Sequence, residues 1–279
     1  MVTRSMMLFE MLLLISVSDA SAQSTGAYLG DLTWPEAEER LATSPIVVIP
    51  FGAGAKEHGP HLPMNADRVV MEYLVTQAVA RMPVLVAPPI LHGWMPAFRE
   101  FPGTSILDPD LFTRYALEIA QVLIRHGAQR IVFLNTGIDH ATGLPLSIAA
   151  REIRAELKTP ALVVSWDDLE DEGIAALEEQ LMGGHGGEIE TSINLFLQAE
   201  SVRMDRAVTD YGDRAVKSYA GYQPGIISRD RGDPGFSETG LFGDPTLATA
   251  EKGRRALEIM TRNWLEALEG FAQVRVPQR

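Results

Sequence analysis

The sequence predicts an α/β protein with a mainly parallel central sheet that is covered by helices on both faces, which is a three-layer fold. Short continuous runs of apolar and β-branched residues, typical of strands buried on both faces, alternate with segments that have helical apolar spacing. The chain has 279 residues, of which 46% are hydrophobic, and this suffices for one large domain with a buried core.

The predicted elements follow in chain order. Strands are expected over residues 45–51, 83–87, 129–134 and 161–166. Helices are expected over residues 67–82, 108–125, 146–157, 187–198 and 247–271. Asp108 followed by Pro109 is typical of a helix start, with Asp108 as the N-cap. The Gly- and Pro-rich stretch 222–245 lacks periodicity and is predicted to be an ordered loop or lid rather than a domain boundary.

The N-terminus has the three-part pattern of a secretory signal peptide. Arg4 precedes an apolar run over residues 6–17, and a small-x-small cleavage site follows at residues 20–22. We therefore expect residues 1–22 to be a signal peptide and residues 23–279 to form a single secreted or periplasmic domain. A misassigned start or an apolar N-terminal helix is the alternative. No other apolar run approaches the roughly 20 residues that a membrane span needs.

Composition excludes several classes of function. The net charge of −13 provides no basic field for phosphates, so no nucleic-acid partner is expected. The chain has no cysteine, which excludes thiolate metal sites, disulfides and cysteine nucleophiles. Any metal must therefore be held by His, Asp, Glu or water.

Candidate metal ligands follow the first and third predicted strands. The loop GAGAKEHGPHLPMNAD spans residues 52–67 and includes His58 and Asp67, and Asn135 to His140 follow the third strand. In open α/β sheets, ligands bind beyond the carboxyl ends of the strands. Imidazoles and a carboxylate suit zinc, manganese or iron. Each residue alone is explained as well by a loop hydrogen bond or, for Asp67, by a helix cap.

Three motifs carry a resemblance to a known family. HGPHLP followed by Asp67, FPGT at residues 101–104 and HGGEIETS at residues 185–192 occur in the order and spacing of the creatininase (creatinine amidohydrolase) family. The chain resembles this family over about residues 30 to 270. The resemblance implies a creatininase-like fold, one or two divalent metals, hydrolysis of a cyclic or linear amide, and often a homo-oligomer.

The metal ligands implied by the resemblance are incomplete. The family's first motif reads E-Q-H-G-x-H, so Lys56 replaces a ligand glutamate whereas His58 is kept, and Asp67 falls at the metal-bridging aspartate. The second motif reads N-G-H-x-[EG]-N, so Gly137 replaces a ligand histidine and Asp139 stands at a ligand glutamate. Two further differences are His140 at the final asparagine of that motif and Phe98 at a family histidine.

Both lost ligands, at positions 56 and 137, belong to one of the two implied metal positions. The other position remains as His58, Asp67 and Asp139, and His140 is either a replacement ligand or a polar loop residue. We therefore predict one divalent ion, with the Lys56 ammonium in place of the second, since a bridging aspartate left unpaired in the interior would cost several kcal/mol. The alternative is that no metal binds.

The resemblance also implies the catalytic residues. A metal would lower the pKa of bound water and polarise an amide carbonyl, and His185 would carry a proton to the leaving nitrogen. Glu188 and Glu190 follow His185 in the same motif, and they complete the expected catalytic set together with Lys56, which departs from the family and is predicted to replace the second ion. Each of the three motif residues has a simpler explanation. His185 could be a loop residue that caps the following helix, and Glu188 lies where a carboxylate favours the helix dipole. Glu190 either orients His185 or contacts the ligand, or it is a solvated residue on the helix surface.

The predicted function is metal-dependent hydrolysis of a small amide or cyclic amide, a C–N bond other than a peptide bond. Creatinine itself is not expected as the substrate, because the two-metal ligand set is not reproduced. The alternatives are a catalytically degenerate relative that binds a small ligand, and a structural oligomeric subunit. The retained His58, Asp67 and His185 count against a purely structural role.

Overall fold

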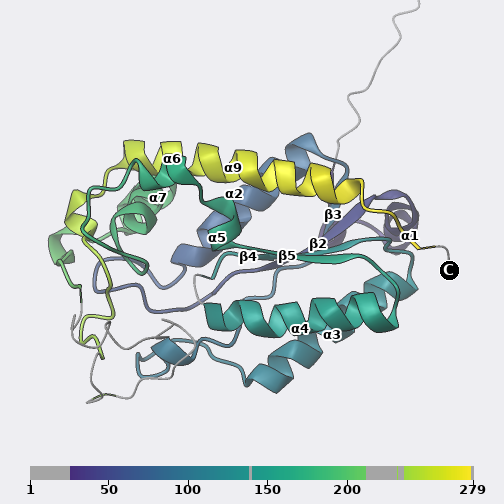
Figure 1. Cartoon of the computed structure of the whole chain (residues 1–279), viewed down its shortest axis with the longest axis horizontal. Coiled ribbons are helices and arrows are strands. Elements are labelled where there is room, and N and C mark those ends of the chain that lie inside the picture. Colours follow the sequence, from purple (N-terminus) through teal and green to yellow (C-terminus); the bar gives the residue numbers. More distant parts are fainter. Residues whose placement is uncertain (1–25, 138–139, 212–230, 232–235, 278–279) are drawn as a thin grey trace, which may run out of the picture.

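The structure, a computed structural model, describes residues 26–137, 140–211, 231 and 236–277. In this part of the chain, parallel strands form a sheet with the order β1-β3-β2-β4-β5. Their bounds are β1 (Ala27–Tyr28), β2 (Ile46–Phe51), β3 (Val84–Val86), β4 (Ile131–Asn135) and β5 (Ala161–Ser165). Helices lie on both sides of the sheet (Figure 1), so the predicted α/β fold with a parallel central sheet is confirmed.

Strand β2 shows why the sheet needs a cover on both faces. All of its side chains are buried. Ile46 and Val48 belong to one hydrophobic core, whereas Val47 and Ile49 belong to the other. Since successive side chains of a strand point to opposite faces, a run of apolar residues feeds two cores at once.

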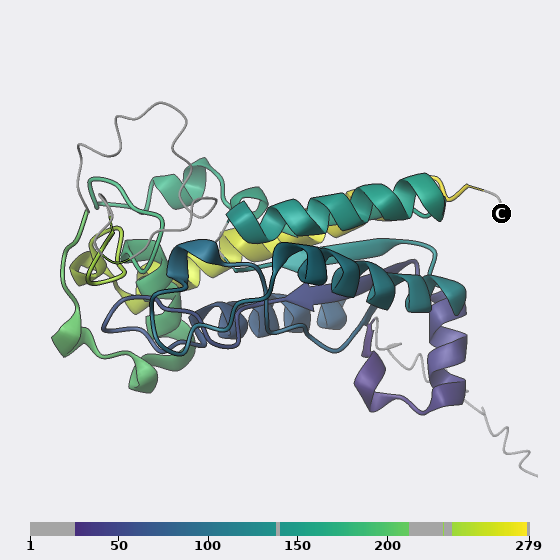
Figure 2. The same ribbon diagram turned by 90° about the horizontal axis from the view of Figure 1, so that it is seen from below.

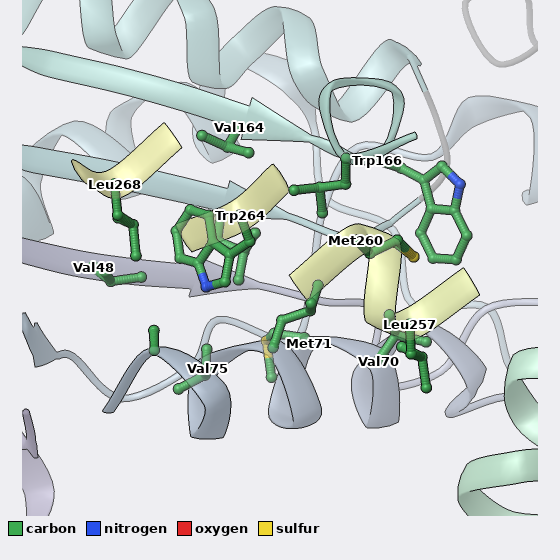
Figure 3. Packing of buried hydrophobic residues seen from close by; sticks show 14 of the residues in the cluster. Val48, Val70, Met71, Val75, Val164, Trp166, Leu257, Met260, Trp264 and Leu268 are labelled. Carbon is green, nitrogen blue, oxygen red and sulfur yellow. The ribbon is translucent and has the colours of Figure 1, made fainter. Parts of the chain in front are cut away.

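The first face is covered by α2 (Ala66–Arg81), α7 (Glu188–Gln198) and α9 (Ala250–Ala272). Figure 3 shows Met260 and Trp264 of α9 between the strands and α2. Helices α7 and α9 approach very closely, because a Cβ atom on Gly253 of α9 would lie 1.9 Å from the Ser192 carbonyl oxygen of α7. Glycine at this position therefore permits the crossing.

The second face is covered by α3 (Pro109–Arg125) and α4 (His140–Glu156), with α1 (Trp34–Thr43) at its edge (Figure 2). Phe112 of α3 packs edge-to-face on Phe51 at a centroid distance of 5.5 Å. Two short helices, α5 (Trp166–Leu169) and α6 (Glu172–Ala175), follow β5. The described 3₁₀ helices are η1 (Leu29–Asp31), η2 (Pro96–Phe98), η3 (Ala199–Ser201), η4 (Met204–Arg206) and η5 (Pro245–Leu247).

Most predicted elements are present, with some differences at their ends. Helix α4 begins at His140 rather than at residue 146. Pro145 lies inside this helix, although a proline in a sequence usually indicates a helix boundary. Strand β1 and helix α1 were not predicted. Within the described residues, no helix is both long and apolar enough to cross a membrane. The predicted signal peptide lies outside the described residues, and the stretch 222–245 is described at Arg231 and from residue 236 onward.

Candidate metal and catalytic site

The candidate site lies beyond the carboxyl ends of β2 and β4, where open α/β sheets bind their ligands. The loop of residues 52–65 follows β2, carries His58 and leads into α2, whose first turn contains Asp67. The Thr136 hydroxyl, just after β4, donates a hydrogen bond to the Asp67 carbonyl oxygen at 3.0 Å. Glu190 comes from the first turn of α7. Three segments far apart in sequence therefore meet at one place.

Lys56 and Asp67 form a fully buried ion pair. The Lys56 Nζ atom lies 2.8 Å from Asp67 Oδ2, and both side chains are 0% exposed. Burial alone would raise the pKa of the Asp67 carboxyl, but Lys56 and His58 outweigh burial and hold this pKa below its usual value. The Lys56 ammonium also lies 5.3 Å from the ring centroid of Phe98 in η2. Asp67 therefore has a cationic partner made of protein atoms.

Gly137 faces this ion pair from the end of β4. A Cβ atom built on Gly137 would lie 3.8 Å from Asp67 Oδ2, the oxygen that Lys56 binds, and 3.4 Å from Asn135 Oδ1. A larger side chain at position 137 would thus project toward the carboxylate that Lys56 already neutralises. The two replacements seen in the sequence, Lys56 and Gly137, share one location.

His58 is held between two carboxylates. Its Nδ1 lies 2.9 Å from the Lys56 carbonyl oxygen, and because a carbonyl only accepts, Nδ1 carries a proton and donates it. Its Nε2 lies 2.9 Å from Asp67 Oδ1 and 3.3 Å from Glu190 Oε1. Burial opposes the charged imidazolium, yet Asp67 and Glu190 outweigh burial and the repulsion from Lys56, so the pKa of His58 rises to about 9. Nε2 therefore needs a proton or another cation.

Glu190 is the second carboxylate at His58. Its Oε2 atom accepts a hydrogen bond from the Gly186 N–H at 2.6 Å, and the residue is buried at 6% exposure. Burial raises the pKa of Glu190, but His58, His185 and Lys56 lower it below its usual value. Its Oε1 atom makes no hydrogen bond within the described residues. This burial excludes the solvated role that the sequence left open.

His185 pairs with a residue that sequence reasoning did not single out. Its Nε2 lies 3.0 Å from Glu57 Oε2, and its ring packs between Phe98, at a centroid distance of 4.3 Å, and His58, at 5.0 Å. Burial raises the pKa of Glu57, but His185 and the Gly59 N–H outweigh burial and lower it. Glu57 and His185 are separated by 128 positions, so only the fold reveals this contact.

The remaining predicted residues lie elsewhere or cannot be placed. Glu188 binds Lys252 and accepts hydrogen bonds from the N–H groups of residues 179 and 180, at 2.7 and 2.8 Å, so its carboxylate belongs to a different network. Asp139 lies outside the described residues. His140 is the first residue of α4, and its side chain is not among those described.

The described donors fit one divalent ion. A nitrogen of His58, a nitrogen of His185 and a carboxylate oxygen of Glu190 all lie within 4.8 Å of one another. His58 has the arrangement that metal-binding histidines usually have, because its other ring nitrogen donates to a backbone carbonyl. Glu190 Oε1 is buried without a hydrogen bond and faces His58. A second ion at Asp67 Oδ2 does not fit, because the Lys56 ammonium occupies that position.

Comparisons with known sequences place the chain among relatives of one family. The sequence model of the family described as creatininase, creatinine amidohydrolase, matches residues 30–268. The chain is 29% identical over 262 residues to creatinine amidohydrolase of Pseudomonas putida, covering 88% of this chain and 97% of that protein. It is also 29% identical over 244 residues to the mycofactocin precursor peptide peptidase of Mycobacterium tuberculosis, covering 83% of this chain and 88% of the relative.

Solved structures share the fold. A manganese form of creatininase superimposes with a TM-score of 0.74 at 28% identity, covering 89% of this chain and 100% of that chain. A zinc–zinc form of a creatininase mutant superimposes equally well, with a TM-score of 0.74 at 28% identity, covering 90% of this chain and 100% of that chain.

Proposed function

This chain belongs to the creatininase family of metal-dependent hydrolases, and we propose that it uses one divalent ion, zinc, manganese or iron, to hydrolyse a small amide or cyclic amide. The observation that carries the proposal is the buried convergence of Asp67 Oδ1 and Glu190 Oε1 on His58 Nε2, at 2.9 and 3.3 Å. Because His58 Nδ1 is already bonded to a carbonyl, Nε2 is its ligand atom.

In this proposal, His58, Asp67 and Glu190 would hold the ion, and Asp139 and His140 remain predicted ligands. His185, whose ring nitrogen lies within 4.8 Å of the donor atoms of His58 and Glu190, is assigned to proton transfer instead of to the ion. An ion bound there would lower the pKa of a water molecule and polarise the amide carbonyl. His185 takes a proton from the attacking water and passes it to the leaving nitrogen as the C–N bond breaks. The rings of Phe98 and His58 hold the His185 ring in place.

Lys56 replaces a second cation in the same proposal. Its ammonium binds Asp67 Oδ2 at 2.8 Å, leaving Oδ1 to face His58. Asp67 can thus serve a single ion without an uncompensated negative charge in the interior. Gly137 supports this role, because its missing side chain leaves the approach to Asp67 Oδ2 open.

The substrate is proposed to be small. The side chains that define the site are nearly inaccessible, with His58 at 1%, His185 at 7% and Glu190 at 6% exposure. The curated relatives carry the names of a creatinine amidohydrolase, a precursor peptide peptidase and a 3-dehydro-scyllo-inosose hydrolase. Members of this family therefore differ in substrate, and the amide class proposed for this chain follows the description of the family as creatinine amidohydrolase.

A second candidate is a relative that binds a small ligand without turnover. The observation that favours it is the charge balance of the buried cluster, in which Lys56 and a protonated His58 can neutralise Asp67 and Glu190 without a metal. The raised pKa of His58, about 9, makes its protonated form the dominant one at neutral pH in metal-free protein. A metal must displace that proton to bind.

Turnover and melting measurements separate the two candidates. Chelator-treated protein, with and without added zinc or manganese, is assayed against small linear amides, lactams and cyclic ureides, and its melting temperature is recorded. The hydrolase proposal predicts amide cleavage that depends on metal and is lost in His58→Asn. His126→Asn, which changes an exposed histidine at the end of α3, should retain it. Identical melting curves without any cleavage would support the ligand-binding candidate.

A further inference from the structure

Glu57 is a buried carboxylate to which the mechanism above gives no role. It follows Lys56 in the loop after β2 and is 8% exposed. Its Oε2 atom lies 3.0 Å from His185 Nε2, and its Oε1 atom accepts a hydrogen bond from the Gly59 N–H. Both carboxylate oxygens are therefore engaged by groups next to the proposed catalytic centre.

The position of Glu57 is fixed on several sides. Its backbone N–H donates to the Thr104 hydroxyl at 3.2 Å. Gly240, which has a φ of +76°, packs so closely that a Cβ atom there would lie 2.0 Å from Glu57 Oε1. A glycine is required at this position both for its backbone conformation and for its contact with the carboxylate. The carboxylate therefore has little freedom to turn away from His185.

His185 is equally constrained. Its backbone exchanges two hydrogen bonds with Phe242, at 3.3 and 2.9 Å. Its ring lies between Phe98 and His58, with interplanar angles of 32° and 29°. These ring contacts fix the plane of the imidazole, and the Glu57 carboxylate lies at its Nε2 atom.

This contact determines where the His185 proton resides. An ionised carboxylate only accepts hydrogen bonds, so Nε2 of His185 carries the proton. In the neutral ring, Nδ1 is then left with a free lone pair. Nδ1 is buried and makes no hydrogen bond within the part of the chain that the structure describes. It is therefore the ring atom available to a reacting group.

We infer that Glu57 is a positioning residue that holds His185 in the Nε2–H tautomer and presents Nδ1 to the substrate. This inference rests on the proposed hydrolase function. In that reaction, Nδ1 accepts one proton from the attacking water as the C–O bond forms. It then returns this proton to the leaving nitrogen as the C–N bond breaks, while Glu57 stays ionised and stabilises the transient imidazolium.

Nitrogen NMR of histidine-labelled full-length protein tests the tautomer directly. His185→Asn assigns the signals. The wild type should show a protonated Nε2 and a pyridine-type Nδ1 for His185. Glu57→Gln, which keeps the shape but can either donate or accept, should give a mixture of tautomers. Glu200→Gln, on an exposed carboxylate, should leave the His185 signals unchanged. If Glu57→Gln does not fold, Gly240→Ala perturbs the same carboxylate and should also mix the tautomers.

Kinetics provide the second measurement, on the amide that the activity assay identifies. Glu57→Gln should lower kcat about 100-fold with KM within about twofold, because it disturbs proton transfer rather than binding. Three results would each overturn the inference. One is an Nδ1–H tautomer of His185 in the wild type, and another is a zinc-induced shift of the Nδ1 signal typical of coordination. The third is a Glu57→Gln variant in which the tautomer and kcat are unchanged. Absence of any turnover in the wild type would instead overturn the hydrolase proposal. The NMR experiment would then still show whether Glu57 fixes the tautomer of His185.

Discussion

The substitution Lys56→Met removes the ammonium from Asp67 and keeps an unbranched apolar side chain that can fill much of the same space. Both members of the pair are 0% exposed and their charged atoms are 2.8 Å apart. The Asp67 carboxylate has no contact with solvent in the folded protein. The change therefore isolates the electrostatic role of Lys56 from its packing.

The expected loss of stability follows from burial. Breaking a buried ion pair by removing one partner costs about 3–5 kcal/mol, because the other charge remains in the interior. The pair of Arg68 and Glu72 on α2 provides the contrast, since its side chains are 45% and 48% exposed at a distance of 2.7 Å. An exposed i, i+4 pair contributes about 0.3–0.5 kcal/mol. The two substitutions should thus differ roughly tenfold in effect.

Urea unfolding of chelator-treated protein at pH 7 measures both changes. Lys56→Met should lower the unfolding free energy by about 3–5 kcal/mol, and Arg68→Met should lower it by less than about 1 kcal/mol. Equal, small losses in the two variants would refute the reasoning, because they would mean that Asp67 does not depend on Lys56 for its charge compensation.

Three further predictions concern the helix crossing, pH and the lost metal position. Gly253→Ala should destabilise the fold by about 1–3 kcal/mol in urea unfolding, because its methyl group would meet the backbone of α7. Gly270→Ala in the same helix should stabilise the fold by about 0.5–1 kcal/mol, because nothing lies within 4 Å of the added methyl group. Similar effects at both positions would contradict the close approach of α7 and α9. In metal-free protein, the pKa of His58 is about 9 in the folded state and about 6.5 in the unfolded state. Its contribution to the free energy of unfolding, on the order of 3 kcal/mol, should therefore be complete below about pH 6.5 and lost as the pH rises through 9. An unfolding free energy that does not change over this pH range would contradict the raised pKa. The double change Lys56→Glu with Gly137→His should raise the number of zinc ions bound per chain from one to two, and an unchanged number in elemental analysis would show that the two positions do not share a metal site.

The layers of the fold could be predicted because they depend on local patterns. Apolar strands such as residues 45–51 and helices with clear periodicity are found close to their expected bounds. Helix α1 escaped detection although Thr33 and Glu36 form a capping box, since its exposed face leaves only Leu41 fully buried. The start of α4 was missed because Pro145 is tolerated inside that helix.

Part of the site also follows from local patterns, whereas its long-range contacts do not. The positions of His58 and Asp67 after β2, and of Gly137 after β4, follow from the rule that ligand sites lie at the carboxyl ends of parallel strands. The contacts of Glu57 with His185 and of Glu190 with His58 depend instead on where the loop before α7 meets the loop after β2. These pairs join residues more than 120 positions apart, so no spacing in the sequence indicates them.

The number of metal ions bound at equilibrium tests the central claim of one ion per chain most directly. Zinc or manganese is titrated into chelator-treated protein, and bound metal is measured by calorimetry and elemental analysis, with His58→Asn as the variant that should lose the site. The account predicts one ion per chain in the wild type and none in the variant. Two ions in the wild type would contradict the replacement of a metal by Lys56, and none would contradict the metal site itself.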